Sequence, residues 1–373
     1  MIYLDSAATT LQKPPTVYRA VRSAMATMTS PGRGTYGPAA RASRTLLACR
    51  EAAAALFQVD QPEQVVLTFN ATHGLNLAIH SLVRPGATVL LSGYEHNAVT
   101  RPLAAIPELR LRVVRAPMFC PDLFLEALEH QLNRGVDVVI CTHVSNVFGY
   151  ALPVEEVANL CRQRQVPLIV DASQSAGVLP VTMQAWGAAF VAMPGHKSLY
   201  GPQGTGLLLC REGGEPLLRG GTGSLSRQPE MPDFLPDRLE AGTHNVPGAA
   251  GLLEGLRFLR RRGIAAIRQQ ETALVAQLAR GLDRLPGVQV YAAWEKGCQT
   301  GVLSFRVAHR DPGWVADALS QRGVAVRAGL HCAPLAHATG GTEATGTVRV
   351  SVLYTPDGEG GIRTLEFAIP FTA

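Results

Sequence analysis

The chain has 373 residues, of which 47% are hydrophobic and 17% charged, and its formal net charge is +5. This size and composition allow a large buried core and are typical of about two domains. The small, scattered positive charge argues against a nucleic-acid partner. An apolar run of about eighteen residues and a signal-peptide pattern are both lacking, so we expect a cytoplasmic protein with no membrane partner.

The seven cysteines also limit the class of protein. They form no CxxC pair and show no metal-ligand spacing, so neither a zinc site nor a disulfide framework is expected. We expect free thiols and no bound metal.

Short apolar runs alternate with helical patterns through the first two thirds of the chain. This alternation predicts an α/β domain with a mostly parallel sheet covered by helices. The expected strands are 64–69, 88–91, 111–115, 136–141, 168–171, 189–193 and 206–210.

The last third predicts a smaller α+β unit. A long amphipathic region, roughly Pro247 to Leu285 with a break at Gly263, leads into strands at 288–291 and 301–307. A helix near 314–321 and strands around 324 and at 347–352 follow. We therefore expect a large domain over 12–246 and a small domain formed by 247–373 together with 1–11. Glycines at 358, 360 and 361 argue against an early start for a C-terminal helix.

Two of the expected strands end abruptly in charged residues. One run ends at Asp171, and the other leads into Gly195-His196-Lys197, followed by a glycine-rich loop. Parallel strands present their chemistry just past their carboxyl ends, so Asp171 and Lys197 should face one crevice. Pyridoxal 5'-phosphate (PLP) needs a lysine for a Schiff base and a carboxylate beside its pyridinium nitrogen. These residues therefore predict a PLP enzyme, although Asp171 could instead cap a following helix.

Seven segments along the chain carry a family resemblance. Together they resemble the cysteine desulfurases, which are fold-type I PLP enzymes of the class V aminotransferase group, and the RAGxHC form at 327–332 resembles their second group. The resemblance implies a fold-type I architecture and a homodimer that takes sulfur from L-cysteine, leaving alanine and an enzyme persulfide. The segments are 3–9, 70–76, 94–97, 171–174, 195–197, 240–243 and 327–332.

The resemblance assigns residues to the cofactor ring. Lys197 would form the Schiff base and carry a proton, and Asp171 would pair with the pyridinium nitrogen. Gln174 would donate to the phenolic oxygen. His96 would stack on the ring, a contact that an aromatic face can make, although a lone histidine can also be structural.

The phosphate is expected where the first strand of the sheet turns into a helix, because free amides and the helix dipole favour an anion there. The resemblance adds His196 as a donor and Thr243 as a residue that reaches the phosphate of the neighbouring subunit. The family commonly has Ser or Thr two residues before that histidine, whereas this chain has Pro194. The amides expected at the helix start belong to Ala71, Thr72 and His73.

Cys332 is the residue on which the predicted activity depends. A thiol attacks as the thiolate, and His331 and Arg327 are expected to lower its pKa. The alternative is a buried cysteine that acts as a small hydrophobe. The second desulfurase group often has His at the position of Leu330.

The resemblance also implies a substrate site. Arg349 would clamp the carboxylate of L-cysteine, because a planar guanidinium suits a bidentate partner; it could instead pair with a surface acid. Asn146 would lie close to the ring oxygen and the substrate, and Arg327 would contribute to substrate binding.

We therefore predict a cysteine desulfurase that passes sulfur to an acceptor such as an iron-sulfur cluster scaffold, a carrier protein or a small thiol. Three alternatives stay open. A selenocysteine lyase would use the same residues, an aminotransferase or epimerase would not need the thiol, and a noncatalytic relative would act as a partner in sulfur transfer.

Overall fold

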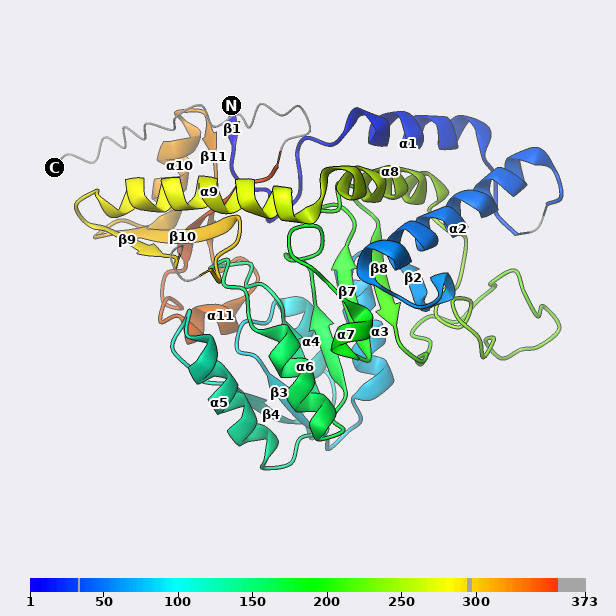
Figure 1. Ribbon diagram of the computed structural model, residues 1–373, viewed down its shortest axis with the longest axis horizontal. Coiled ribbons are helices and arrows are strands. Elements are labelled where there is room, and N and C mark those ends of the chain that lie inside the picture. Colours follow the sequence, from blue (N-terminus) through cyan, green and yellow to red (C-terminus); the bar gives the residue numbers. More distant parts are fainter. Residues whose placement is uncertain (33, 294–296, 355–373) are drawn as a thin grey trace.

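A computed structural model describes residues 1–32, 34–293 and 297–354, and a seven-stranded sheet forms its centre (Figure 1). The strand order is β2-β8-β7-β6-β5-β3-β4, and only β8 runs antiparallel to its neighbours. This confirms the predicted α/β fold with a mostly parallel sheet. The strands are β2 (Val65–Thr68), β3 (Thr88–Leu91), β4 (Arg110–Val113), β5 (Val138–Thr142), β6 (Leu168–Asp171), β7 (Phe190–Pro194) and β8 (Gly206–Cys210).

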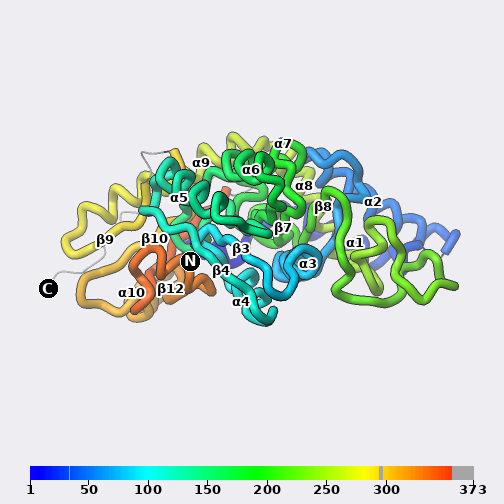
Figure 2. The backbone as a smooth tube through the Cα atoms, turned by 90° about the horizontal axis from the view of Figure 1, so that it is seen from below, coloured from blue at the N-terminus to red at the C-terminus, as the bar shows by residue number. Residues whose placement is uncertain are grey.

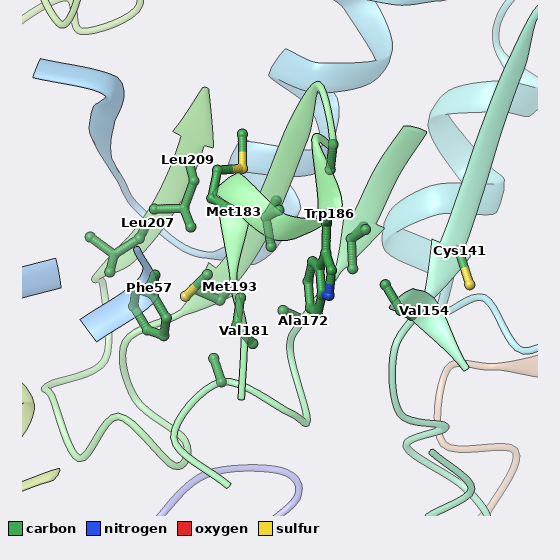
Figure 3. Close-up of a cluster of buried hydrophobic side chains, with 14 of the residues drawn as sticks. Phe57, Cys141, Val154, Ala172, Val181, Met183, Trp186, Met193, Leu207 and Leu209 are labelled. Atoms are coloured by element: carbon green, nitrogen blue, oxygen red, sulfur yellow. The ribbon is translucent and has the colours of Figure 1, made fainter. Parts of the chain in front are cut away.

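The apolar runs that predicted these strands are buried on both faces. Side chains alternate across a strand, so Leu168 and Val170 belong to one core while Ile169 belongs to the other. Figure 3 shows part of the first core, where Trp186 and Met183 pack near strand residues such as Met193. The sheet therefore separates two hydrophobic cores.

Helices cover both faces of the sheet (Figure 2). The first core is closed by α2 (Gly37–Phe57), α5 (Pro121–Leu132), α6 (Val154–Gln163), α7 (Met183–Trp186) and α8 (Val246–Arg262). The second is closed by α3 (Ala71–Leu82) and α4 (Asn97–Ala104). Helix α1 (Pro15–Thr27) packs on α8, and a 3-10 turn, Pro62–Gln64, precedes β2.

The smaller unit contains a four-stranded antiparallel sheet in the order β12-β13-β10-β9. A separate parallel pair joins β1 near the N-terminus to β11. The elements of the smaller unit are β1 (Ile2–Tyr3), α9 (Ile264–Asp283), β9 (Val288–Tyr291), β10 (Val302–Val307), α10 (Pro312–Ser320), β11 (Val324–Ala325), β12 (Arg327–Gly329), α11 (Pro334–Thr339) and β13 (Thr347–Ser351).

The long amphipathic region is two helices that meet at Gly263. This glycine has φ of 84°, a backbone conformation that favours glycine, and it ends α8 and precedes α9 as predicted. Helix α9 runs from the end of α8 toward the smaller sheet (Figure 1). Three short elements, β1, β12 and α11, were not among the predicted ones. The expectation for the C-terminal glycines lies outside the described residues.

One face of β13 contacts the large domain, where Arg349 donates to the Asn146 carbonyl in the loop after β5. Val348 and Val350 point into the core of the small unit, so Thr347, Arg349 and Ser351 lie on the opposite face. The hydroxyl of Ser351 accepts a hydrogen bond from the Ala7 amide, which fixes the N-terminal segment there. No helix of the described ranges is long and apolar enough to cross a bilayer.

Candidate active site

The site is built at the carboxyl ends of three adjacent strands. β5, β6 and β7 end at Thr142, Asp171 and Pro194, and the loops that follow carry the other predicted side chains. One pocket collects most of them. Its predicted members are Ala71, Thr72, His96, Asn146, Asp171, Gln174, His196 and Lys197, and it is also lined by Asn70, Ala98, Thr142, Val144, Ser173 and Pro194.

Asp171 and Lys197 face this pocket together. Burial lowers the pKa of Lys197 to about 8, and the negative charge of Asp171 opposes that shift. One carboxylate oxygen of Asp171 accepts from the Ser173 amide at 2.9 Å. No helix begins at this point, since the next helix, α7, starts at Met183. The alternative in which Asp171 caps a helix is therefore not what the structure shows.

His96 combines a pocket position with a structural role. It is the N-cap residue of α4, where its Nδ1 accepts from the Ala98 amide at 3.0 Å. Burial lowers the pKa of His96, with Asp171 opposing and Lys197 adding to the shift. A neutral ring whose Nδ1 accepts must carry its proton on Nε2. The hydrogen bond therefore fixes both the tautomer and the orientation of the ring.

The expected phosphate end is the first turn of α3. Ala71 and Thr72 line the pocket there, and amides in a first helical turn have no partner within the helix. The His73 amide differs, because it donates to the side chain of Asn70 at 2.9 Å. The His73 ring stacks on Phe69 and faces a second pocket. The structure thus brings Ala71 and Thr72 to the site but turns His73 away from it.

Residues of the N-terminal segment hold His196 in place. Its Nδ1 lies 3.0 Å from the Thr9 hydroxyl, and its carbonyl oxygen accepts from the Thr10 hydroxyl. Lys13 reaches the same carbonyl at 3.4 Å. Burial first, and then the charges of Lys197 and Lys13, lower the pKa of His196 to about 4, so the ring is neutral at pH 7. The N-terminal segment therefore positions this histidine next to Pro194.

Gln174 and Asn146 use their amide groups to join separate parts of the chain. Gln174 Nε2 donates to the Ala7 carbonyl at 3.0 Å, and Asn146 Nδ2 donates to the His331 carbonyl at 2.9 Å. Both side chains still line the pocket. They tie the pocket wall to the N-terminal segment and to the loop that carries Cys332.

Cys332 is exposed on a loop that lies against the pocket wall. All seven cysteines fall within the described ranges, and Cys332 alone among them is exposed. Its carbonyl accepts from the Asn97 amide at 2.7 Å, next to His96. His331 and Cys332 have φ of 49° and 55°, in the left-handed region that non-glycine residues rarely adopt. The structure therefore does not show the alternative of a buried, inert thiol.

His331 is buried, unlike its neighbour. Its Nε2 lies 3.1 Å from the Thr347 carbonyl, which can only accept, so Nε2 carries the proton. Burial, followed by the charge of Arg349, lowers the pKa of His331 to about 2. The imidazole is neutral at pH 7, so any effect of His331 on the Cys332 thiol comes from a neutral ring. The sequence motif alone did not reveal this burial.

Arg349 on β13 and Arg327 on β12 lie directly opposite each other in the antiparallel strand pair. Arg349 is 2% exposed, and its terminal nitrogens donate to Asp5 at 2.6 Å and to the Asn146 carbonyl at 3.1 Å. Arg327 is exposed. The alternative in which Arg349 pairs with a surface acid is correct only in part, because its partner Asp5 is an acid whose side chain is only 20% exposed.

Thr243 lies away from these residues. It lines the second pocket with Glu240, His244 and the turned-away His73, and not the pocket of Lys197. Arg50 holds this segment through a buried bidentate pair with Glu240, at 2.6 and 2.7 Å. The structure therefore does not join Thr243 to the other predicted residues within one chain.

Three residues that contact side chains of the site, or the turn before His96, were not among the predicted ones. Asp5 holds Arg349, and Thr9 holds His196. Glu95 is fully buried and accepts from the Ser92 and Gly93 amides, which fixes the turn before His96. Glu95 adjoins His96 in the sequence, but nothing in the sequence pattern links residues 5 and 9 to their distant partners.

Comparisons with known proteins agree with this geometry. The model of the class V aminotransferase family matches residues 2–360. A probable cysteine desulfurase of Methanothermobacter thermautotrophicus is 32% identical over 95% of this chain and 90% of its own length. A cysteine desulfurase of Serratia proteamaculans is 30% identical over 89% of this chain and 84% of its own length.

Solved structures give the same result. The apo cysteine desulfurase of Thermococcus onnurineus NA1 has a TM-score of 0.86 at 31% identity, covering 94% of this chain and 90% of that one. A cysteine desulfurase of Escherichia coli in its S-sulfonic acid form has a TM-score of 0.81 at 26% identity, covering 94% and 89%.

The fold and the strand-end lysine and aspartate define a fold-type I PLP enzyme. Within that class, the chain belongs to the class V aminotransferase family and groups there with the cysteine desulfurases.

Proposed function

We propose that this chain is a PLP-dependent cysteine desulfurase that converts L-cysteine to L-alanine and holds the sulfur as a persulfide on Cys332. The observation that carries the proposal is the placement of Cys332. It is the exposed cysteine, and its loop is tied to the pocket wall through the His331 and Cys332 carbonyls. An aminotransferase or epimerase would not need such a thiol.

The residues of the pocket fit PLP. Thr142 Oγ1 is buried and lines the pocket, and it has no hydrogen-bond partner within the described chain. Such a hydroxyl requires a partner, which a bound polar group would supply. Lys197, Asp171 and Gln174 would hold the ring, His96 would stack on it, and Ala71, Thr72 and His196 would hold the phosphate. When bound, PLP supplies an electron sink for bonds at the substrate Cα.

Lys197 is suited to move a proton. Its pKa of about 8 leaves a substantial neutral fraction at pH 7 to 8, so the amine can accept a proton from Cα and return it. Asp171 raises this pKa from the value that burial alone would give. The lysine therefore stays within the range in which it both accepts and donates.

Cys332 would take the sulfur. Its thiolate attacks the substrate sulfur, so an S–S bond forms as the substrate C–S bond breaks, and the electron pair of that bond stays with the carbon fragment. Protonation of the fragment gives alanine. Arg349 and Asn146 would orient the substrate carboxylate so that its sulfur points to the loop.

The proposal extends to the assembly. Thr243 would reach the phosphate of a partner subunit in a homodimer, and a sulfur acceptor, such as an iron-sulfur cluster scaffold, would collect the persulfide in the cytoplasm. The boundary between the proposed domains, 12–246 and 247–373 with 1–11, falls at the start of α8.

The test compares wild type, Cys332→Ala and Cys120→Ala, the last being a matched control at a half-buried cysteine. The purified protein should show the yellow absorbance of lysine-bound PLP. Alanine release from L-cysteine should fall about 100-fold or more in Cys332→Ala and stay unchanged in the control. A yellow protein that releases no alanine from L-cysteine would favour an aminotransferase or epimerase, and a colourless protein would favour a noncatalytic role. Full alanine release in Cys332→Ala would refute the role given to this thiol. Comparing turnover on selenocysteine with turnover on cysteine separates a desulfurase from a selenocysteine lyase.

A further inference from the structure

Arg349 is a buried cation with an unused donor. Its guanidinium has five N–H donors, and the structure shows one contact to Asp5 and one to the Asn146 carbonyl. Its Nε is buried and has no partner among the described residues. An unpaired buried donor on a charged group is costly, so this edge of the fork calls for an acceptor that the described residues do not supply.

A second cation raises the need for an anion. Arg327 lies directly opposite Arg349 on the neighbouring strand, and side chains of directly opposite residues project from the same face. Like charges in this position repel each other. Asp5 is the carboxylate that pairs with Arg349, at 2.6 Å. One carboxylate beside two arginines leaves a net positive charge for a second carboxylate.

Asp5 is itself held firmly. Its neighbour Leu4 donates through its amide to the Ala325 carbonyl, and Asp5 forms a parallel bridge to Ser351. The Tyr3 hydroxyl lies 3.2 Å from the Asp5 carbonyl oxygen. The carboxylate therefore reaches Arg349 from a fixed backbone, and Arg349 cannot rotate without losing it.

We propose that Asp5 is a positioning residue that holds the Arg349 fork with its Nε edge free for the α-carboxylate of the substrate. This inference rests on the proposed function, because it assigns that site an amino-acid substrate. Asp5 does not touch the substrate. It acts through Arg349 and makes the enzyme selective for amines that carry a carboxylate.

Two other roles for the same ion pair make different predictions. A purely structural pair would affect every substrate alike. If the Asp5 carboxylate competed with the substrate for Arg349, it would weaken substrate binding, and removing it would strengthen substrate binding. The comparison of substrates with and without a carboxylate separates all three roles.

The test uses the PLP-loaded full chain as wild type, Asp5→Asn and Tyr3→Phe. Tyr3→Phe loosens the same segment but keeps the Asp5 carboxylate. In Asp5→Asn we expect KM for L-cysteine to rise about tenfold or more, because a hydrogen bond to a charged group is weakened. We expect kcat to stay within about twofold. Turnover of cysteamine, which lacks the carboxylate, should not change in either variant. Tyr3→Phe removes one contact to the Asp5 backbone, so it should raise KM for L-cysteine by less than Asp5→Asn does.

A titration with L-alanine makes the test independent of sulfur release. L-alanine carries the carboxylate but no sulfur, and its binding is measured by the change in PLP absorbance. We expect Asp5→Asn to weaken it about tenfold. Equal losses on L-cysteine and cysteamine, or a lower KM for L-cysteine, would overturn the inference. A wild type that binds L-alanine but releases no sulfur would refute the proposed function and leave this inference standing.

Asp5→Glu provides a second test in case Asp5→Asn does not fold. It keeps the charge but lengthens the side chain, so the fork shifts while the ion pair remains. An intermediate rise in KM for L-cysteine, with cysteamine turnover unchanged, supports positioning. A wild-type KM would show that charge alone is sufficient and would refute it.

Discussion

At the scale of single residues, burial decides the chemistry of the site more than sequence proximity does. His331 and Cys332 are neighbours in one motif, yet the first is buried and neutral and the second is exposed. The motif predicts a reactive thiol at Cys332, and the structure shows this cysteine exposed. It could not indicate the state of His331, which depends on packing against Thr347 and Arg349, residues at least sixteen positions away. The contact between Asp5 and Arg349 likewise depends on packing, because the two residues lie far apart in the sequence.

Burial of Lys197 makes capture of PLP pH-dependent. Only the neutral amine reacts with the PLP aldehyde, and its pKa of about 8 means that it is mostly protonated below pH 8. For the apo protein we expect the capture rate to rise roughly tenfold per pH unit below pH 8 and to level off above it. Stopped-flow absorbance after mixing with PLP measures this rate.

The control for this profile is Lys13→Met. Burial also lowers the pKa of Lys13 to about 8, and this lysine lies beside His196. If Lys13 were the titrating group, the inflection would disappear in Lys13→Met. We expect the inflection to persist there. In Asp171→Asn it should move to lower pH, because the charge that raises the pKa of Lys197 is gone.

At the scale of elements, prediction succeeded where a pattern is local. Buried strands such as β6 and β8 show as continuous apolar runs, and Gly263 shows as a break in an amphipathic pattern. Short elements were missed because tertiary contacts define them. β1 has two residues and exists through its pairing with β11, and β12 has three residues paired with β13. Three residues or fewer cannot display a periodicity.

Helix α9 carries a buried acid that couples it to the end of the described chain. Glu271 is 2% exposed and accepts from the Tyr354 amide at 3.0 Å. Burial raises its pKa to about 8. The folded state therefore keeps a proton that the unfolded chain releases above about pH 4.5, and stability should fall as pH rises from there to about 8.

Glu271→Gln should remove this fall, because glutamine keeps the acceptor and cannot ionise. We expect the Tm of wild type to drop by about a few degrees relative to the variant between pH 6 and pH 9. Scanning calorimetry at several pH values measures this difference. Glu51→Gln, at an exposed position on α2, serves as the control and should follow wild type. Parallel curves for Glu271→Gln and wild type would show that Glu271 is not the titrating group.

At the scale of the whole molecule, the two pockets divide the predicted cofactor residues. Lys197 and Asp171 line one pocket, whereas Thr243 lines the other. The sequence placed all of them in one site through resemblance and also assigned Thr243 to a neighbouring subunit. In the single chain Thr243 lies outside the Lys197 pocket, and its assignment to a neighbouring subunit stays a prediction. A C2 dimer would then contain two sites, each completed by the partner.

Hybrid dimers can test this sharing of Thr243. Thr243→Val should weaken PLP binding about tenfold to 100-fold, because one hydrogen bond to a charged phosphate is lost. Lys197→Ala should abolish turnover. In a hybrid of the two variants, one site combines an intact Lys197 with an intact Thr243 from the partner, and the other site lacks both. After the two variants are dissociated and mixed in equal amounts, random pairing should restore about a quarter of wild-type turnover at limiting PLP. If Thr243 served its own chain, every site in the hybrid would carry a defect and mixing would restore nothing.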